Sequence, residues 1–282
     1  MTLASAILIG DLHLREDTPQ CRTDDYWSEQ WRKMKFIRDL QREHGCPVLQ
    51  PGDFFDHWKP SPRLLAQTFL HIPDKLWVIA GNHDLPQHSM DLFDKCGLYA
   101  LSVGAPDKVR IINNPFCIKD KMIWMTHRPV YNKDVPPWHT DAVTARYLLR
   151  YNPEYDLILT GDLHDKFIEQ YAGANTPHQL LVNPGSVMRM TTDQINHEPA
   201  VFLWYANSNT VEEVPIPIKQ GVITRAHIDK QKDKENRYQA FIDGLAMKGQ
   251  SGLSFRDNLE RHFSNNRTLG AVKNLIYEMM EK

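Results

Sequence analysis

One pattern recurs along this 282-residue chain and restricts its fold: a short apolar run ends, and Asp, His or Asn follows at once. The clusters are Asp11/His13, Asp53/Asp56, Asn82/His83/Asp84, His127 and Asp162/His164. Short apolar runs of this kind are typical of buried strands. Because ligands gather at the carboxyl ends of strands in α/β sheets, these side chains can converge although they are far apart in sequence.

The segments between the first clusters have helical patterns. Trp27 to His44 carries apolar residues at helical spacing with charges between them, which predicts an amphipathic helix. Further helices are expected at Pro62 to His71 and at Ser89 to Leu98, each between two apolar runs. This strand–helix alternation implies right-handed crossovers and a largely parallel sheet.

The pattern changes from Val109 onward. Short apolar runs now follow one another at spacings that suit a second sheet, with one helix expected near Thr140 to Tyr151. After about Gly221 the strand patterns stop, and two or three helices are expected. We predict an α/β catalytic domain of two sheets flanked by helices over residues 1–220, and a small helical C-terminal extension over 221–282.

Composition excludes several classes of protein. The formal net charge is −2, so nucleic-acid binding would need a local basic patch. The four cysteines are scattered, without a Cys-x-x-Cys pair, which indicates reduced thiols inside a cell. The apolar start lacks a basic region, and no apolar run approaches the ~20 residues of a membrane span. We expect a cytoplasmic protein without membrane association.

Converging carboxylates need a partner. Two such charges ~4 Å apart repel by roughly 4 kcal/mol at an effective dielectric constant of 20. A bound cation removes this repulsion, and imidazoles among carboxylates suit a divalent transition metal. The sequence therefore predicts a metal site, and the number of candidate ligands suggests two ions.

The motifs "GDLH", "GDFFD", "GNHD", "THR" and a second "GDLH" resemble, in order and context, the five motifs of calcineurin-like metallophosphoesterases. "GDFFDHWKPS", "VIAGNHDLPQHSMD" and "NPGSVMRMTTDQ" look most like the SbcD-type DNA-repair nucleases, especially short phage or prophage versions. The resemblance covers roughly residues 5 to 215. It implies an α/β/β/α sandwich.

The resemblance also implies a set of site residues. The first ion would take Asp11, His13, Asp53 and His164. The second would take Asp53, Asn82, His127 and Asp162. Asp53 would thus bridge two ions, between which a hydroxide is held to attack phosphorus. His83 would protonate the leaving group as general acid, and Asp56 would orient a catalytic histidine or a loop.

Some positions depart from the family or extend it. The motif that usually reads Gly-His-x-His has Asp162 at its first histidine, which favours Mn²⁺, or Mg²⁺, over Zn²⁺. Asp56 stands where several related nucleases outside bacteria carry histidine. The candidate substrate contacts are His57 and His88, close to motifs, and Arg189 after "NPGS". The alternative for each is an ordinary packing or surface role.

The preferred prediction is a Mn²⁺-dependent nuclease that hydrolyses phosphodiester bonds of single- or double-stranded DNA. An SbcC-type ATPase partner and a homodimer follow by family analogy alone. One alternative is a phosphodiesterase or phosphatase acting on nucleotides or other small phosphate esters. A second alternative is a catalytically silent subunit that binds DNA ends.

Overall fold

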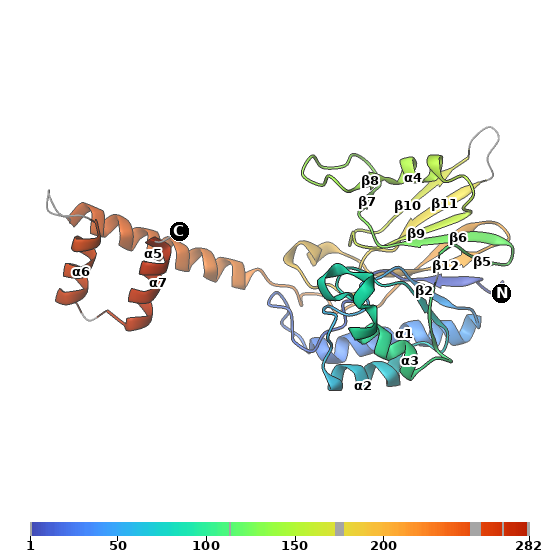
Figure 1. The fold of residues 1–282 in the computed structure, drawn as a ribbon, viewed down its shortest axis with the longest axis horizontal. Helices are drawn as coiled ribbons and strands as arrows, with labels where there is room; N and C mark the ends of the chain where they lie inside the picture. Colours follow the sequence, from blue (N-terminus) through green and yellow to red (C-terminus); the bar gives the residue numbers. More distant parts are fainter. Residues whose placement is uncertain (1, 113, 173–177, 249–254, 267, 281–282) are drawn as a thin grey trace. The chain divides into compact units, whose positions relative to one another are not determined.

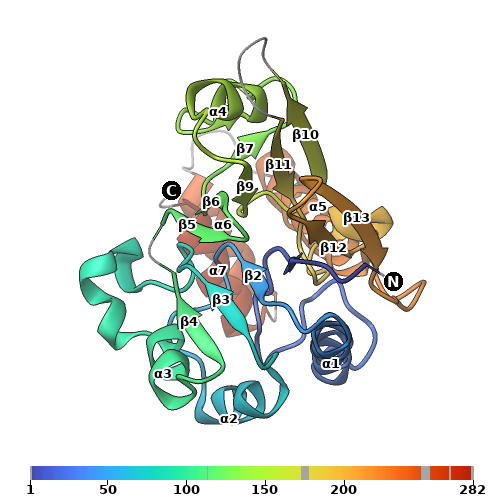
Figure 2. The same ribbon diagram turned by 90° about the vertical axis from the view of Figure 1, so that its right-hand side faces the viewer.

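The computed structural model describes residues 2–112, 114–172, 178–248, 255–266 and 268–280 (Figures 1 and 2). The chain divides into two units, Met1–Thr224 and Arg225–Lys282. The assignment of catalysis to residues 1–220 stays a prediction.

Among the described residues, a six-stranded sheet has the order β13-β12-β1-β2-β3-β4. Its parallel strands are β1 (Ala6–Leu8), β2 (Val48–Gln50), β3 (Leu76–Val78) and β4 (Val109–Ile111). An antiparallel hairpin of β12 (Ala200–Tyr205) and β13 (Thr210–Pro215) adds to β1. The connections between the parallel strands contain α1 (Tyr26–His44), α2 (Pro62–His71) and α3 (Gly97–Gly104). The predicted strand–helix alternation is thus confirmed.

A second sheet has the order β10-β11-β9-β6-β5 within the described ranges. Its strands are β5 (Phe116–Ile118), β6 (Lys121–Thr126), β9 (Leu157–Thr160), β10 (Phe167–Tyr171) and β11 (Gln179–Asn183). The central strands β6, β9 and β11 are parallel, and the edge strands β5 and β10 are antiparallel to their neighbours. The short strands β7 (Val130–Tyr131) and β8 (Val143–Thr144) pair separately, before α4 (Ala145–Tyr151).

Side-chain alternation along the short strands separates the layers of the core. In β1, Ile7 packs in the cluster that contains α1, α2 and α3, whereas Leu8 packs between the two sheets. In β9, Leu157 joins that inter-sheet cluster, while Ile158 packs with Leu148 of α4 on the outer face. Figure 2 shows the resulting order of helices, sheet, sheet and helix. The predicted two-sheet sandwich flanked by helices is therefore confirmed.

The helix predicted over Ser89 to Leu98 is placed wrongly. The 3-10 helices η1 (Pro86–His88) and η2 (Met90–Lys95) occupy this region, and α3 starts at Gly97. Cys96 is extended and caps α3 by accepting from the Tyr99 N–H. The helix expected near Thr140 to Tyr151 likewise begins only at Ala145, because Thr144 belongs to β8 and caps α4.

The C-terminal unit is helical, as predicted. It contains α5 (Ala226–Lys248), α6 (Phe255–Asn265) and α7 (Gly270–Met280), labelled in Figure 1. Its small core is built from Leu259, Phe263 and Ile276. Among the described residues, no helix combines the length and the apolar character that crossing a bilayer requires.

Candidate metal centre

The predicted site residues lie in loops that leave the carboxyl ends of parallel strands. The loops after β1, β2 and β3 come from the first sheet, and those after β6 and β9 come from the second. Backbone hydrogen bonds join them. The N–H groups of Leu12 and His13 both donate to the Asp53 carbonyl. The Asp162 N–H donates to Asp11 Oδ2 at 3.0 Å, which connects the two sheets at the site.

Glycines permit this close approach of the loops. A Cβ on Gly161 would lie 2.7 Å from Asp11 Oδ1 and 2.8 Å from His127 Nδ1. Three predicted ligands have a left-handed backbone, with φ of 43° at His13, 53° at Asp53 and 78° at Asp162. Such conformations are uncommon outside glycine and persist where the surrounding structure enforces them, often at functional sites.

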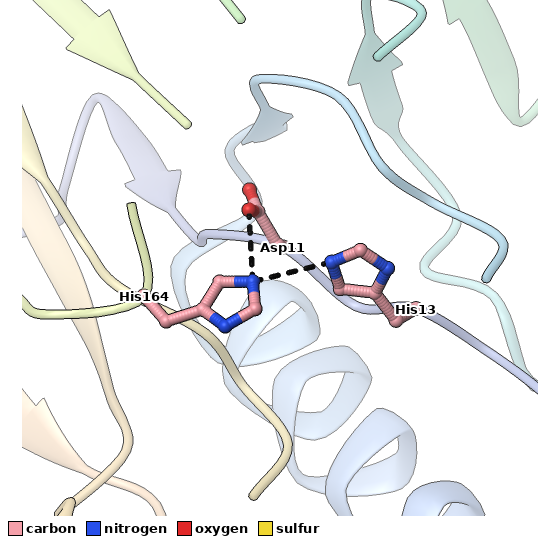
Figure 3. Close-up of side chains that lie close together, drawn as sticks. All are labelled: Asp11, His13 and His164. Atoms are coloured by element: carbon pink, nitrogen blue, oxygen red, sulfur yellow. Dashed lines mark hydrogen bonds and ion pairs between the residues drawn. The ribbon is translucent and has the colours of Figure 1, made fainter. Parts of the chain in front are cut away.

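The first group consists of Asp11, His13 and His164 (Figure 3). The His164 Nε2 atom lies 3.3 Å from His13 Nε2 and 3.7 Å from Asp11 Oδ2. One donor atom of each side chain falls within 4.8 Å of the others. This spacing lets all three atoms face one ion.

Asp53 connects this group to a second one. Its Oδ2 atom lies 3.6 Å from His13 Nε2 and 3.1 Å from His127 Nε2. The Asn82 amide group lies 2.8 Å from His127 Nε2, and Asp162 Oδ1 lies 3.8 Å from the same nitrogen. The predicted ligands therefore form one connected group, in which Asp53 contacts His13 of the first set and His127 of the second. Their coordination to metal stays a prediction.

The protonation of these groups reflects their burial and mutual charge. Burial lowers the pKa of His13 to about 3 and also lowers that of His164, so both imidazoles are neutral and keep a lone pair for an ion. Burial also raises the pKa of Asp11 well above its usual range. Burial alone would lower the pKa of His127. The Asp53 hydrogen bond and the surrounding carboxylates outweigh this effect and raise the pKa to about 9.

An unsatisfied polar atom tests whether these residues fit a cation. Asp11 Oδ1 is buried and has no hydrogen-bond partner in the described part of the chain. Such orphaned atoms are rare and call for a specific explanation, of which an ion is one. The donors are imidazole nitrogens with carboxylate and amide oxygens, a set that suits divalent transition metals. The residues present fit a divalent cation, and the expectation of two ions stays a prediction.

His83 and Asp56 lie beside these groups. The His83 N–H donates to Asp53 Oδ1 at 2.9 Å, and its Nδ1 lies 2.8 Å from the Asp56 carbonyl oxygen. A carbonyl only accepts, so Nδ1 carries the hydrogen and Nε2 is the atom that can gain or release a proton. The Asp56 carboxylate lies 3.1 Å from an Arg15 nitrogen and 3.6 Å from His13 Nδ1. Asp56 thus contacts two imidazoles, as an orienting residue would.

The predicted substrate contacts separate into two cases. His57 and His88 line a cavity of about 350 Å³ together with Asp56, Asn82 and His83. Arg189 is placed elsewhere: its side chain is buried, and its guanidinium donates to the carbonyls of Ile195 and Lys219. Because the side chain is buried and both terminal nitrogens are bonded to carbonyls, the structure does not support a contact with substrate.

Two structural contributors were not identified from the sequence. Asp84 is fully buried, and its carboxylate accepts from the N–H groups of Phe54, Phe55 and Gly81, which ties the loops after β2 and β3 together. Burial raises its pKa to about 6. The second contributor is the loop after β11, whose Val187 N–H donates to the Asp11 carbonyl. The "GNHD" and "NPGS" motifs pointed to these two loops in the sequence. They did not reveal the buried hydrogen bonds that the loops form.

A family model described as calcineurin-like phosphoesterase matches residues 5–166. No curated protein matches the chain. Similar solved structures include a metallophosphoesterase from Sphaerobacter thermophilus, which is 11% identical with a TM-score of 0.41 and covers 77% of this chain and 90% of its own. A Thermotoga maritima protein solved by NMR is 15% identical with a TM-score of 0.35 and covers 76% of this chain and 98% of its own. Only the match to the family model is used to assign the chain to a family.

Proposed function

The chain belongs to the calcineurin-like phosphoesterases, and from this premise we propose that it is a metal-dependent DNA nuclease of the SbcD type. The observation that carries the proposal is that Asp53 lies among Asp11, His13 and His127, with His83 beside it. A bound pair of divalent cations supplies Lewis-acid activation of water and of a phosphate oxygen. The carboxylate of Asp162, a predicted ligand where the family usually has histidine, favours Mn²⁺, with Mg²⁺ as the alternative.

The residues of the chain provide the remaining chemistry. Asp53 contacts His13 of the first set of predicted ligands and His127 of the second. It thereby fixes the position of the two sets relative to each other. Asp56 fixes the His83 ring through its carbonyl, so that Nε2 can deliver a proton to the departing alkoxide. Because Nδ1 is committed to this bond, the imidazole can lose only the Nε2 proton without breaking it.

Two cavities, each lined in part by a residue of the centre, support a diester substrate. One, of about 350 Å³, is lined by His83 and the candidate contacts His57 and His88. Another, of about 630 Å³, is lined by His164, Tyr131 and Lys133 among others. A phosphodiester carries two substituents on phosphorus, and we assign one cavity to each of them. The choice of DNA rests on the resemblance of the "GDFFDHWKPS" and "VIAGNHDLPQHSMD" stretches.

End-labelled single- and double-stranded DNA, incubated with Mn²⁺, tests the proposal. A chromogenic diester, bis(p-nitrophenyl) phosphate, and the monoester p-nitrophenyl phosphate are assayed in parallel, with Asp53→Asn as the control. Mn²⁺-dependent cleavage of DNA that Asp53→Asn abolishes is the expected result. Turnover of the small esters alone would favour the nucleotide or small-ester alternative. Binding of DNA ends without any hydrolysis would favour the silent subunit.

An SbcC-type ATPase partner, a homodimer and a cytoplasmic location belong to the same proposal. They rest on the family resemblance and the composition, and co-purification with the partner and the measured mass in solution would test the first two.

A further inference from the structure

The loop after β11 joins the backbones of two predicted metal ligands. The Val187 N–H donates to the Asp11 carbonyl at 2.9 Å, and the Ser186 N–H donates to the His164 carbonyl at 3.1 Å. Asp11 follows β1 of the first sheet, whereas His164 follows β9 of the second. The pair Ser186–Val187, which we call the ligand link, therefore ties a ligand of one sheet to a ligand of the other.

The ligand link has little room to move. Ser186 and Val187 are buried, and a Cβ on the preceding Gly185 (φ +69°) would lie 2.5 Å from the His164 carbonyl oxygen. The Ser186 hydroxyl donates to the Met188 carbonyl and accepts from the Gln194 amide. A displacement of the link would therefore shift the backbones of both ligands.

Two side chains from other elements hold the carbonyls of the ligand link. Lys33 of α1 donates from Nζ to the Val187 carbonyl at 2.6 Å. The His197 Nε2 atom lies 2.7 Å from the Ser186 carbonyl oxygen. Because a carbonyl only accepts, this nitrogen carries a hydrogen. Each residue of the link thus donates its N–H to the carbonyl of a predicted metal ligand and accepts at its own carbonyl from a basic side chain.

Packing alone does not explain why Lys33 is buried, because burying its charge costs free energy. Its side chain is 1% exposed, and no carboxylate of the described residues forms an ion pair with it. The nearby Glu29 is engaged by Arg32 at 2.6 Å. Burial lowers the pKa of Lys33 to about 7, which reflects the penalty on its charge. An apolar side chain would avoid this penalty, so what the amine adds is its directed bond to Val187.

We propose that Lys33 and His197 are positioning residues that hold the ligand link and thereby set the spacing of Asp11 and His164 for the first cation. The proposal rests on the proposed function only for the presence of the metal, and it is independent of DNA as the substrate.

Calorimetric titration of the full chain with MnCl₂ tests this role, using Lys33→Met beside Lys35→Met. Lys35 lies on the same helix, is exposed and pairs with Asp39, so it is a matched control. Loss of residues that orient ligands typically weakens metal binding by about 10- to 100-fold. We expect a loss of this size for one of two ions in Lys33→Met, wild-type affinities in Lys35→Met, and partial recovery in Lys33→Gln, whose amide can still donate.

Circular dichroism establishes which variants are folded at the titration temperature. Folded Lys33→Met that binds both ions with wild-type affinity would overturn the proposal. Should Lys33→Met not fold, His197→Ala gives the same decision: a loss for one ion supports the role, and two unchanged affinities overturn it. Wild-type protein that binds Mn²⁺ but leaves DNA intact would remove only the nuclease proposal, whereas wild-type protein that binds no Mn²⁺ would remove both.

Discussion

At the scale of single residues, His83 is the group whose proton chemistry is most closely specified. Its Nδ1–H is committed to the Asp56 carbonyl, and its backbone N–H is committed to Asp53 Oδ1. The ring also lies edge-on against His13, with centroids 4.8 Å apart. These contacts fix both the position and the tautomer of the imidazole, and its role as general acid stays a prediction.

We expect His83→Ala to lower kcat on DNA by roughly 10²- to 10⁴-fold, the usual contribution of a general acid. The effect on bis(p-nitrophenyl) phosphate should be much smaller, because p-nitrophenolate leaves without protonation. Steady-state kinetics on both substrates, with Mn²⁺ occupancy measured by calorimetry, checks this. Equal losses on both substrates, or wild-type turnover of DNA at full occupancy, would show that His83 is not the acid.

Lys33 gives a pH dependence of stability whose sign follows from its pKa. Burial depresses that pKa from 10.5 to about 7 in the folded chain. Between these values the unfolded chain binds more protons, so this residue makes stability rise with pH, by at most about 1.4 kcal/mol per unit. The destabilisation caused by burying the charged amine is largest below pH 7, and it disappears as the pH approaches 10.5.

Urea unfolding of wild type and Lys33→Met at pH 7 and pH 9.5 measures this contribution. The increase in unfolding free energy between the two pH values should be smaller in the variant. An identical increase in both proteins would mean that Lys33 does not titrate in this range.

At the scale of elements, the strand ends could be predicted because their signal is local. Each is an apolar run that stops at a polar cluster, and Asp11, Asp53 and His164 indeed meet where such strands end. The position of Arg189 could not be predicted, because its burial depends on carbonyls of Ile195 and Lys219 that only the fold brings near.

Two other gaps have a similar origin. Asp84 has the same sequence context as its polar neighbours, and only the three N–H groups around its carboxylate reveal its structural role. The helix expected over Ser89 to Leu98 fails because Cys96 is extended and restarts the helix at Gly97. A hydrophobic pattern records which residues are apolar, but it does not record where the backbone changes direction.

The loop glycines provide a test at the element scale. In Gly161→Ala the new Cβ would lie 2.7 Å from Asp11 Oδ1 and 2.8 Å from His127 Nδ1. Both atoms belong to predicted ligands, so the loop after β9 has to move away from the centre. We expect Mn²⁺ affinity to fall by at least about 10-fold with little change in the circular dichroism spectrum. Gly270→Ala is a control for glycine replacement, because a Cβ there would have no neighbour within 4 Å and its backbone does not have a positive φ. Wild-type Mn²⁺ affinity in Gly161→Ala would contradict the packing described for this loop.

At the scale of the whole molecule, the donors to each predicted ion come from both sheets. Asp11 and His13 follow β1 of the first sheet, and His164 follows β9 of the second. An ion held by all three would fasten the sheets to each other, in addition to the apolar core between them. Removal of the ion should therefore lower the free energy of global unfolding, in addition to changing the site itself.

Removing metal with EDTA should lower the melting temperature, and added Mn²⁺ should restore it. At a concentration 100 times Kd, one bound ion stabilises the folded state by about 2.7 kcal/mol. For a unit of this size that corresponds to roughly 5 to 10 °C. Scanning calorimetry with EDTA, with Mn²⁺ and with both checks the shift. An unchanged melting temperature in all conditions would count against the metal centre.

The division of the ligands between two sheets also bears on biosynthesis. A nascent chain that has emerged as far as β4 already carries Asp11, His13, Asp53 and Asn82, whereas His127, Asp162 and His164 are still to be made. Such a chain has donors for an ion but not the geometry to discriminate among ions. If these residues bind a cation as predicted, its selective binding would have to wait until the second sheet has left the ribosome, so the supply of that cation would matter once β11 has been made rather than when the first sheet is synthesised.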